Sequence, residues 1–286
     1  MTAELTRLPV PAAELGEGPC WDAAIATLYW TDIPASTVHA LDADGQHRSW
    51  AVGQQVGAIG LRASGGLVLA AEEGFVTMDT SLGAVAPLVS VEHGAPDVRL
   101  NDGAIDRAGR FYAGSMAHDE RPGPGALYRL DPDHTLTRLI TGLGVSNGIG
   151  WSPDDTQMYY VDSLDHRLDV LDYDAATGEI GERRPLAEIG SGEVLPDGLT
   201  VDADGGIWVA VWGGGAVLRF SPAGELTTTV ELPARLVTCP TFGGPDLKTL
   251  YITTAAGAGG EGGAGAGALY SCQPGVTGQP TYPYRG

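Results

Sequence analysis

Oxygen-bearing side chains stand directly before several regularly spaced glycines in this chain of 286 residues. The glycines recur at intervals of about 40 to 50 residues, and the residues just before them are, in order, Glu17, Val56, Asp102, Asn147, Asp197 and Phe242. If the repeats superpose around one axis, these side chains converge. Glu17, Asn147 and Asp197 would then offer two carboxylates and one amide, which are ligands that hard divalent cations prefer. The sequence therefore predicts a metal site on the axis of the repeats.

Two of these positions also have a simpler interpretation. The Asn-Gly and Asp-Gly dipeptides at 147–148 and 197–198 are typical of tight hairpin turns, so either one alone could mark a turn. Three oxygen-bearing residues share one position in the repeat, however, and carboxylates gathered without a counter-ion repel one another. The shared position favours a cation site, with the hairpin turn as the alternative.

Short runs rich in β-branched and aromatic residues make up the rest of the pattern, and helical periodicity is scarce. Each run is bounded by Gly, Pro, Asp or Asn, which is typical of strands separated by turns. The strongest runs are 27–33, 66–71, 110–116, 157–163, 206–212 and 249–255. Tryptophans mostly fall in such runs, and we expect core or inter-blade packing for Trp21, Trp30, Trp151, Trp208 and Trp212.

Six units of this kind fill the chain, at the period of a four-stranded propeller blade. We therefore predict an all-β fold, with a single six-bladed β-propeller domain over residues 1–286 and the metal site in its central channel. Because an exposed sheet edge is a liability, the N-terminal strand (about 5–14) is expected to complete the last blade beside 268–272. The glycine-rich stretch 256–268 is expected to be a mobile hairpin loop. A β-sandwich or a pair of β domains is the alternative.

Composition limits the classes of partner. The chain has 16 Lys and Arg against 36 Asp and Glu, a net charge of −20, which counts against nucleic acid and anionic membranes. No apolar stretch approaches the roughly 18 residues of a membrane span. The three cysteines are too few for a disulfide framework, and the first residues lack a signal-peptide pattern. We expect a cytoplasmic protein with buried, reduced thiols; its oligomeric state is left open.

Four blocks of sequence carry a wider resemblance: GEGPCWD (16–22), RLNDGAIDRAGRFYAGSM (99–116), VSNGIGWSPD (145–154) and LPDGLTVDADGGIWVA (195–210). Together with YYVDS (159–163) and DYDAATG (172–178), they resemble the signature blocks of the SMP-30/gluconolactonase family, which includes regucalcin. The similarity spans nearly the whole chain. It implies a six-bladed propeller that holds one divalent metal in its channel and hydrolyses sugar lactones.

The resemblance also implies roles for individual residues. Glu17, Asn147 and Asp197 match the metal ligands of the family, and Arg99 and Asn101 match its substrate contacts. After the AGSM block the family often has a glutamate that contacts substrate. Here Asp119 occupies that place and Glu120 follows, so the expected contact is a shorter acid that reaches less far, and the resemblance leaves the substrate preference open.

The implied reaction is metal-dependent hydrolysis of a sugar lactone, such as glucono-, xylono- or arabinolactone, to the aldonic acid. The cation would polarise the carbonyl and acidify a water, and Asp197 is the candidate general base, with Asp119 as second choice. Oxygen ligands leave Ca²⁺, Mg²⁺, Mn²⁺, Zn²⁺ and Fe²⁺ open. A phosphotriesterase or aryl-esterase activity at the same metal is one alternative, and a non-enzymatic calcium-binding propeller is another.

Overall fold

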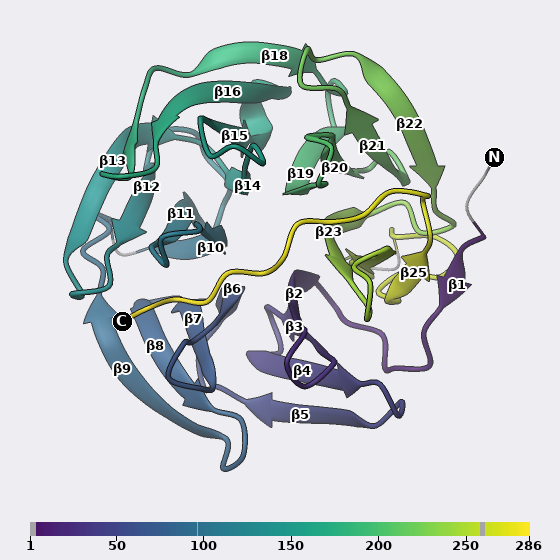
Figure 1. Cartoon of the computed structure of the whole chain (residues 1–286), viewed down its shortest axis with the longest axis horizontal. Helices are drawn as coiled ribbons and strands as arrows, with labels where there is room; N and C mark the ends of the chain where they lie inside the picture. Colours follow the sequence, from purple (N-terminus) through teal and green to yellow (C-terminus); the bar gives the residue numbers. More distant parts are fainter. Residues whose placement is uncertain (1–3, 96, 258–260) are drawn as a thin grey trace.

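Six antiparallel sheets are arranged as blades around a common axis (Figure 1). They are seen in a computed structural model that describes residues 4–95, 97–257 and 261–286. The protein is an all-β, six-bladed β-propeller, as the repeat period predicts. Within these residues no helix is both long enough and apolar enough to cross a bilayer.

The first three blades follow one another along the chain. Blade 1 contains β2 (Gly16–Asp22), β3 (Thr27–Asp32), β4 (Thr37–Asp42) and β5 (His47–Ala51). Blade 2 contains β6 (Val56–Leu61), β7 (Leu67–Ala71), β8 (Gly74–Asp79) and β9 (Ala84–Ser90). Blade 3 contains β10 (Val98–Ile105), β11 (Phe111–Ala117), β12 (Gly125–Leu130) and β13 (Leu136–Leu143).

The other three blades complete the ring. Blade 4 contains β14 (Ser146–Trp151), β15 (Gln157–Asp162), β16 (Arg167–Asp174), β17 (Glu179–Ile180) and β18 (Arg184–Glu188), with the short 3₁₀ helix η1 (Ser163–Asp165) after β15. Blade 5 contains β19 (Leu195–Val201), β20 (Ile207–Trp212), β21 (Ala216–Phe220) and β22 (Leu226–Glu231). Blade 6 contains β23 (Val237–Gly243), β24 (Thr249–Thr254), β25 (Tyr270–Cys272) and β1 (Thr6–Arg7).

The six strongest predicted runs are the second strands of the six blades. The run 27–33 is β3 and the run 206–212 is β20, each within a residue of the predicted bounds. Every residue of β3 is buried, because a second strand lies between an innermost strand and a third strand and also packs against the neighbouring blades. Both faces of such a strand are covered, which is why these runs are rich in apolar and β-branched residues.

The two ends of the chain close the ring, as predicted. Thr6 pairs with Ser271 and Arg7 pairs with Tyr270, so β1 is the outermost strand of the last blade. The glycine-rich stretch connects β24 to β25, but its residues 258–260 lie outside the described residues, and its mobility stays a prediction.

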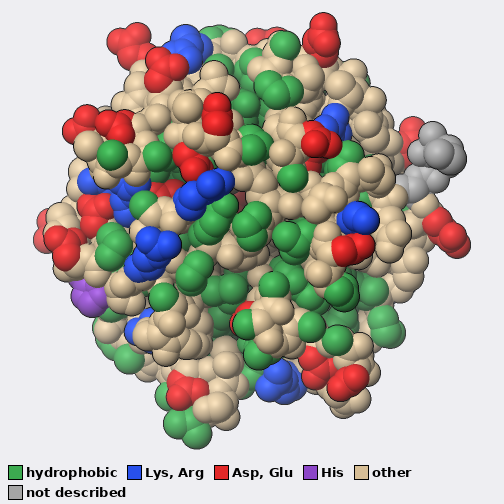
Figure 2. All heavy atoms as spheres, in the orientation of Figure 1, with side chains coloured by type: hydrophobic (Ala, Val, Ile, Leu, Met, Phe, Trp, Pro, Cys, Tyr) green, Lys and Arg blue, Asp and Glu red, His purple; other side chains and the backbone are tan. Residues whose placement is uncertain are grey.

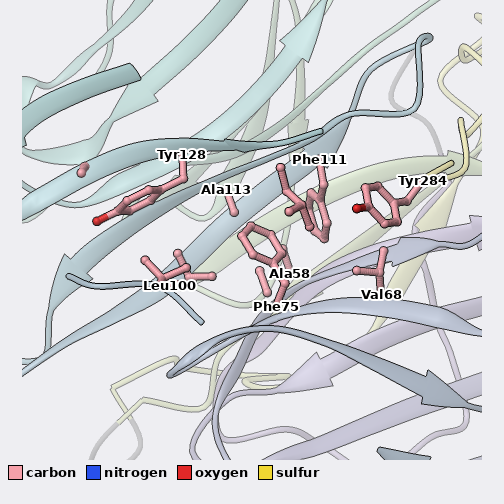
Figure 3. Close-up of a cluster of buried hydrophobic side chains, with 12 residues drawn as sticks. Ala58, Val68, Phe75, Leu100, Phe111, Ala113, Tyr128 and Tyr284 are labelled. Carbon is pink, nitrogen blue, oxygen red and sulfur yellow. The ribbon is translucent and has the colours of Figure 1, made fainter. Parts of the chain in front are cut away.

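Apolar side chains fill the spaces between adjacent blades. Figure 3 shows such a cluster, in which Phe75 of blade 2 meets Phe111 of blade 3 with ring centroids 5.3 Å apart. Tyr284, near the C-terminus, is buried in the same cluster, and its hydroxyl donates to the carbonyl oxygen of Asp131. The last residues of the chain are therefore part of the core.

The C-terminal segment 273–286 crosses the middle of the ring on the face seen in Figure 1, a course that the sequence did not reveal. Its backbone bonds to turns at the far ends of the innermost strands: Ala203 N donates to Thr277 O, and Tyr284 N donates to Leu61 O. Figure 2 shows this face, with acidic and basic side chains interspersed around it. The segment covers one end of the channel.

Candidate metal centre

A cavity opens at the end of the channel opposite the C-terminal segment. It lies where the innermost strands begin, and blades 1, 3, 4 and 5 contribute to it. Its polar lining consists of Glu17, Arg99, Asn101, Glu120, Asn147, Ser163 and Asp197. The structure thus brings together all three expected metal ligands and two of the three expected substrate contacts.

Each expected ligand lies at a β-bulge in an innermost strand. The strand register shifts between Glu17 and Cys20 in β2, between Ser146 and Ile149 in β14, and between Pro196 and Leu199 in β19. A bulge inserts a residue into one strand and changes the direction in which its side chain points. All six innermost strands have such a shift, so the repeat places the ligands at one level of the channel.

The glycines that follow the ligands are required by close packing between innermost strands. A Cβ on Gly148 would lie 2.8 Å from the carbonyl oxygen of Asp197, and a Cβ on Gly198 would lie 2.4 Å from Cys239 Sγ. Both glycines lie inside strands, β14 and β19, so the alternative of hairpin turns at these dipeptides is wrong. Only glycine allows such a close approach of backbone.

The amide of Asn147 is held with its oxygen free. Its Nδ2 donates to Ser163 Oγ at 3.1 Å, and Ser163 Oγ in turn donates to the carbonyl oxygen of Pro196 at 2.7 Å. Because the Ser163 proton is used, Asn147 must present its NH₂ group there and turn Oδ1 the other way. Asn147 Oδ1 is buried and has no hydrogen-bond partner among the described residues. An unpaired buried oxygen of this kind fits a cation ligand.

The carboxyl groups of Glu17 and Asp197 are buried with too little positive charge nearby to balance their own. Burial raises the pKa of Glu17 well above its usual range, and the charges of Asp197 and Asp102 add to the rise. Burial likewise raises the pKa of Asp197, followed by the charge of Asp102. In the described part of the chain no three His, Cys, Asp or Glu side chains form a metal cluster. The candidate ligands at this cavity are two carboxylates and the amide oxygen of Asn147, an arrangement outside that definition. A divalent cation would offset the repulsion and leave positions for substrate.

Arg99 and Asn101 form a fixed polar wall on blade 3. Arg99 Nη1 donates to Asn101 Oδ1 at 2.8 Å and to the carbonyl oxygen of Leu100, and Asn101 Nδ2 donates to the carbonyl oxygen of Ser146. Burial lowers the pKa of Arg99 to about 10, although Glu17 and Glu120 act in the opposite direction. The guanidinium is therefore still charged at neutral pH and is held in place by Asn101.

The predicted contact at Asp119 needs correction, because Glu120 and not Asp119 lines the cavity. The Asp119 side chain is 61% exposed and forms an ion pair with Arg121. A turn closed by Glu120 N and the Ala117 carbonyl oxygen gives Glu120 a φ of 57°, and this conformation puts the next acid in the cavity. Side-chain direction in a turn depends on backbone angles that the sequence motif did not reveal.

Two further positions of the repeat column face a different cavity, although Asp102 is close enough for its charge to raise the pKa of Glu17 and Asp197. Asp102 and Phe242 line a second cavity, beneath the C-terminal segment, together with Cys20 and Cys239. The register of blade 6 shifts between Val237 and Cys239, so the glycine spacing had placed the repeat position of this blade too far along the chain.

The three cysteines are free and buried, as predicted.

Asp102 should make the cation-free protein less stable at higher pH. Burial raises its pKa to about 7 in the folded chain, against about 4 in an unfolded one. A group with a raised folded pKa contributes stability that is complete below the unfolded pKa and is lost as the pH rises through the folded value. We expect Asp102→Asn to raise the melting temperature of chelator-treated protein at pH 8 by several degrees, at roughly 2–4 °C per kcal/mol.

The expected signature is a difference between Asp102→Asn and wild type that grows from pH 4 to pH 8 in thermal melts. Asp44→Asn, on an exposed turn, is the matched control and should show no such growth. A constant difference at all pH values would show that Asp102 does not carry this destabilisation.

Comparisons with known proteins agree with this fold and its blocks. A family model described as the SMP-30/Gluconolactonase/LRE-like region matches residues 15–256. Regucalcin of Xenopus laevis is 38% identical over 249 residues, which cover 85% of this chain and 83% of that protein. The structure of regucalcin from Agrobacterium tumefaciens, described as a calcium-binding protein, superposes with a TM-score of 0.93 at 29% identity, covering 100% of this chain and 97% of the other. A luciferin-regenerating enzyme superposes with a TM-score of 0.91 at 30% identity, covering 99% of each chain. The chain described here belongs to the SMP-30/gluconolactonase/LRE-like family.

Proposed function

We propose that this protein hydrolyses a sugar lactone with the help of one divalent cation held by Glu17, Asn147 and Asp197. The observation that carries the proposal is the unpaired, buried oxygen of Asn147 in the same cavity as two buried carboxylates. Membership in a family named after a gluconolactonase supports the substrate class. A divalent cation at these ligands supplies Lewis acidity toward a carbonyl oxygen.

Asp197 is the proton acceptor in this proposal. A water oxygen bonds to the lactone carbonyl carbon, the water proton moves to an Asp197 carboxylate oxygen, and the ring C–O bond breaks. The ring oxygen takes that proton from Asp197 and becomes the free hydroxyl of the aldonic acid, which leaves Asp197 as a carboxylate again. A general base works best with a pKa near the operating pH. Burial raises the pKa of Asp197 in the cation-free protein, and the charge of a bound cation would lower it again and favour the carboxylate that accepts the proton.

Blade 3 supplies the contacts to the hydroxyl groups of the substrate. Both hydrogen bonds that Arg99 makes within the described residues come from Nη1, so Nε and Nη2 remain for a ligand. Glu120 adds an acceptor in the same cavity. Donors and an acceptor on one wall can orient a polyhydroxylated ring.

Glu120 and Asp119 can be separated by matched substitutions. Glu120→Gln should raise KM for an aldonolactone about tenfold, because a hydrogen bond to a charged group is worth about 1.5–3 kcal/mol. Asp119→Asn should stay within about twofold of wild type, since its exposed ion pair with Arg121 contributes little. The measurement is pH-stat kinetics on glucono-, xylono- and arabinolactone, with the spontaneous rate subtracted. A larger rise in KM for Asp119→Asn than for Glu120→Gln would show that Asp119, and not Glu120, contacts the substrate.

The same assay separates the alternatives. Turnover of paraoxon or phenyl acetate without turnover of any lactone would favour the phosphotriesterase or aryl-esterase activity. The regucalcin from Agrobacterium tumefaciens is described as a calcium-binding protein, and calcium binding without catalysis is the second alternative for this chain. Tight calcium binding by calorimetry, with no turnover of any substrate on the panel, would overturn the lactonase proposal in favour of that role.

A further inference from the structure

The cavity has an apolar side that no role has yet been given. Leu15, Val145 and Leu195 each stand two residues before an expected ligand and line the same cavity. Each ligand therefore shares the cavity with an aliphatic side chain from two residues earlier in the chain. We call Leu15, Val145, Leu195 and Trp212 the apolar collar.

Trp212 is the largest member of the apolar collar. It ends β20 and pairs across the ladder with Leu195, so the indole stands beside the strand that carries Asp197. The sequence predicts core or inter-blade packing for Trp212, yet this residue is only partly buried and lines the cavity. The other four tryptophans expected in the core, Trp21, Trp30, Trp151 and Trp208, are at most 8% exposed.

The lining is divided between blades. Arg99, Asn101 and Glu120 of blade 3 form the polar wall, with Met116 of the same blade beside them. The rest of the apolar lining, which is the apolar collar and Ile33, comes from blades 1, 4 and 5. A lactone derived from a sugar has the same division: hydroxyl groups stand at the edge of the ring, and C–H bonds cover its faces. Aromatic side chains bind such apolar faces with a large contact area and little loss of conformational freedom.

We propose that Trp212 is a specificity-determining residue that stacks on the C–H face of the lactone ring, while blade 3 reads the hydroxyl groups. This inference rests on the proposed lactonase function and names its substrate class: five- or six-membered cyclic esters with hydroxyl groups along one edge. The stacking contact is the same in the bound substrate and the transition state, so it affects KM and leaves kcat nearly unchanged.

The test uses cation-loaded full-length protein and two substrates, gluconolactone and the unsubstituted δ-valerolactone. Trp212→Ala should raise KM for both by roughly tenfold, about 1.4 kcal/mol, with kcat within about twofold. Trp212→Phe, which keeps an aromatic face, should stay within about threefold of wild type. Glu120→Gln should affect gluconolactone alone. Trp50→Ala, in an outer strand of blade 1, is the matched control and should match wild type.

Calorimetric titration with glucose, a hydroxylated six-membered ring that has no ester to hydrolyse, gives a readout apart from turnover, and Trp212→Ala should weaken that binding by a similar factor. Unchanged KM and unchanged glucose affinity in a folded Trp212→Ala protein would overturn the inference. Loss on gluconolactone alone would also overturn it, because it would assign Trp212 to hydroxyl recognition. If the alanine variant does not fold, Trp212→Leu replaces it, with the same expected rise in KM. A wild type without lactone turnover would overturn the proposed function itself, whereas wild-type turnover with an unaffected variant overturns only the role of Trp212.

Discussion

Asp197→Asn should lower kcat for lactone hydrolysis by about 100- to 10,000-fold, the range for removing a positioned general base. The substitution also removes one of two carboxylates from the expected cation ligands. The amide keeps the shape of the side chain, and burial strongly disfavours the charge that it removes. We therefore expect the cation-free variant to melt no lower than wild type at neutral pH.

The measurement is pH-stat kinetics with a thermal melt of the same preparation. Asp204→Asn, an exposed residue on the turn after the same strand, is the control and should keep full activity. Full cation-dependent turnover by Asp197→Asn would remove Asp197 from both of its proposed roles. Lost activity together with an unfolded protein would be explained by folding alone, so the melt is part of the result.

Removal of the cation should abolish turnover and lower the melting temperature together. A ligand present at about 100 times its Kd stabilises the folded state by about 2.7 kcal/mol. In a chain of this size, that corresponds to a shift of roughly 5–10 °C. Re-addition of Ca²⁺, Mg²⁺, Mn²⁺ or Zn²⁺, one at a time, should restore both properties in the same order of effectiveness.

Asn147→Ala tests whether this shift belongs to the proposed site. The variant lacks the unpaired oxygen, so added cation should raise its melting temperature much less than that of wild type. A protein stripped of metal, verified by elemental analysis, that retains full lactonase activity would contradict a cation-dependent reaction.

Local patterns predicted the strands because a strand depends on residues near one another in sequence. The ring closure pairs Thr6 with Ser271, and it was predictable from the repeat and the need to cover a sheet edge. The run 206–212 is apolar throughout because both faces of its strand are covered, and such a run is visible in the sequence. The glycines after Asn147 and Asp197 were also informative, although for a different physical reason than a turn: they allow neighbouring innermost strands to touch.

Features that depend on exact backbone angles or on distant contacts were not predictable in the same way. The choice of Glu120 over Asp119 follows from one turn conformation. The course of the C-terminal segment depends on backbone bonds to turns of several blades, such as that from Tyr284 to Leu61, and its own residues have no strand periodicity. The position of Trp212 at the cavity follows from where β20 ends, since a residue further inside the strand would be buried like Trp208.

Anomalous X-ray diffraction from crystals grown with Mn²⁺ tests most directly whether three blades share one cation. We expect one strong peak in the channel, with oxygens of Glu17, Asn147 and Asp197 about 2.1–2.6 Å away, as in oxygen-ligand sites of divalent cations. A map with the three side chains turned apart and no peak between them, in crystals of protein that binds Mn²⁺ in solution, would contradict the proposed metal centre and the reaction built on it.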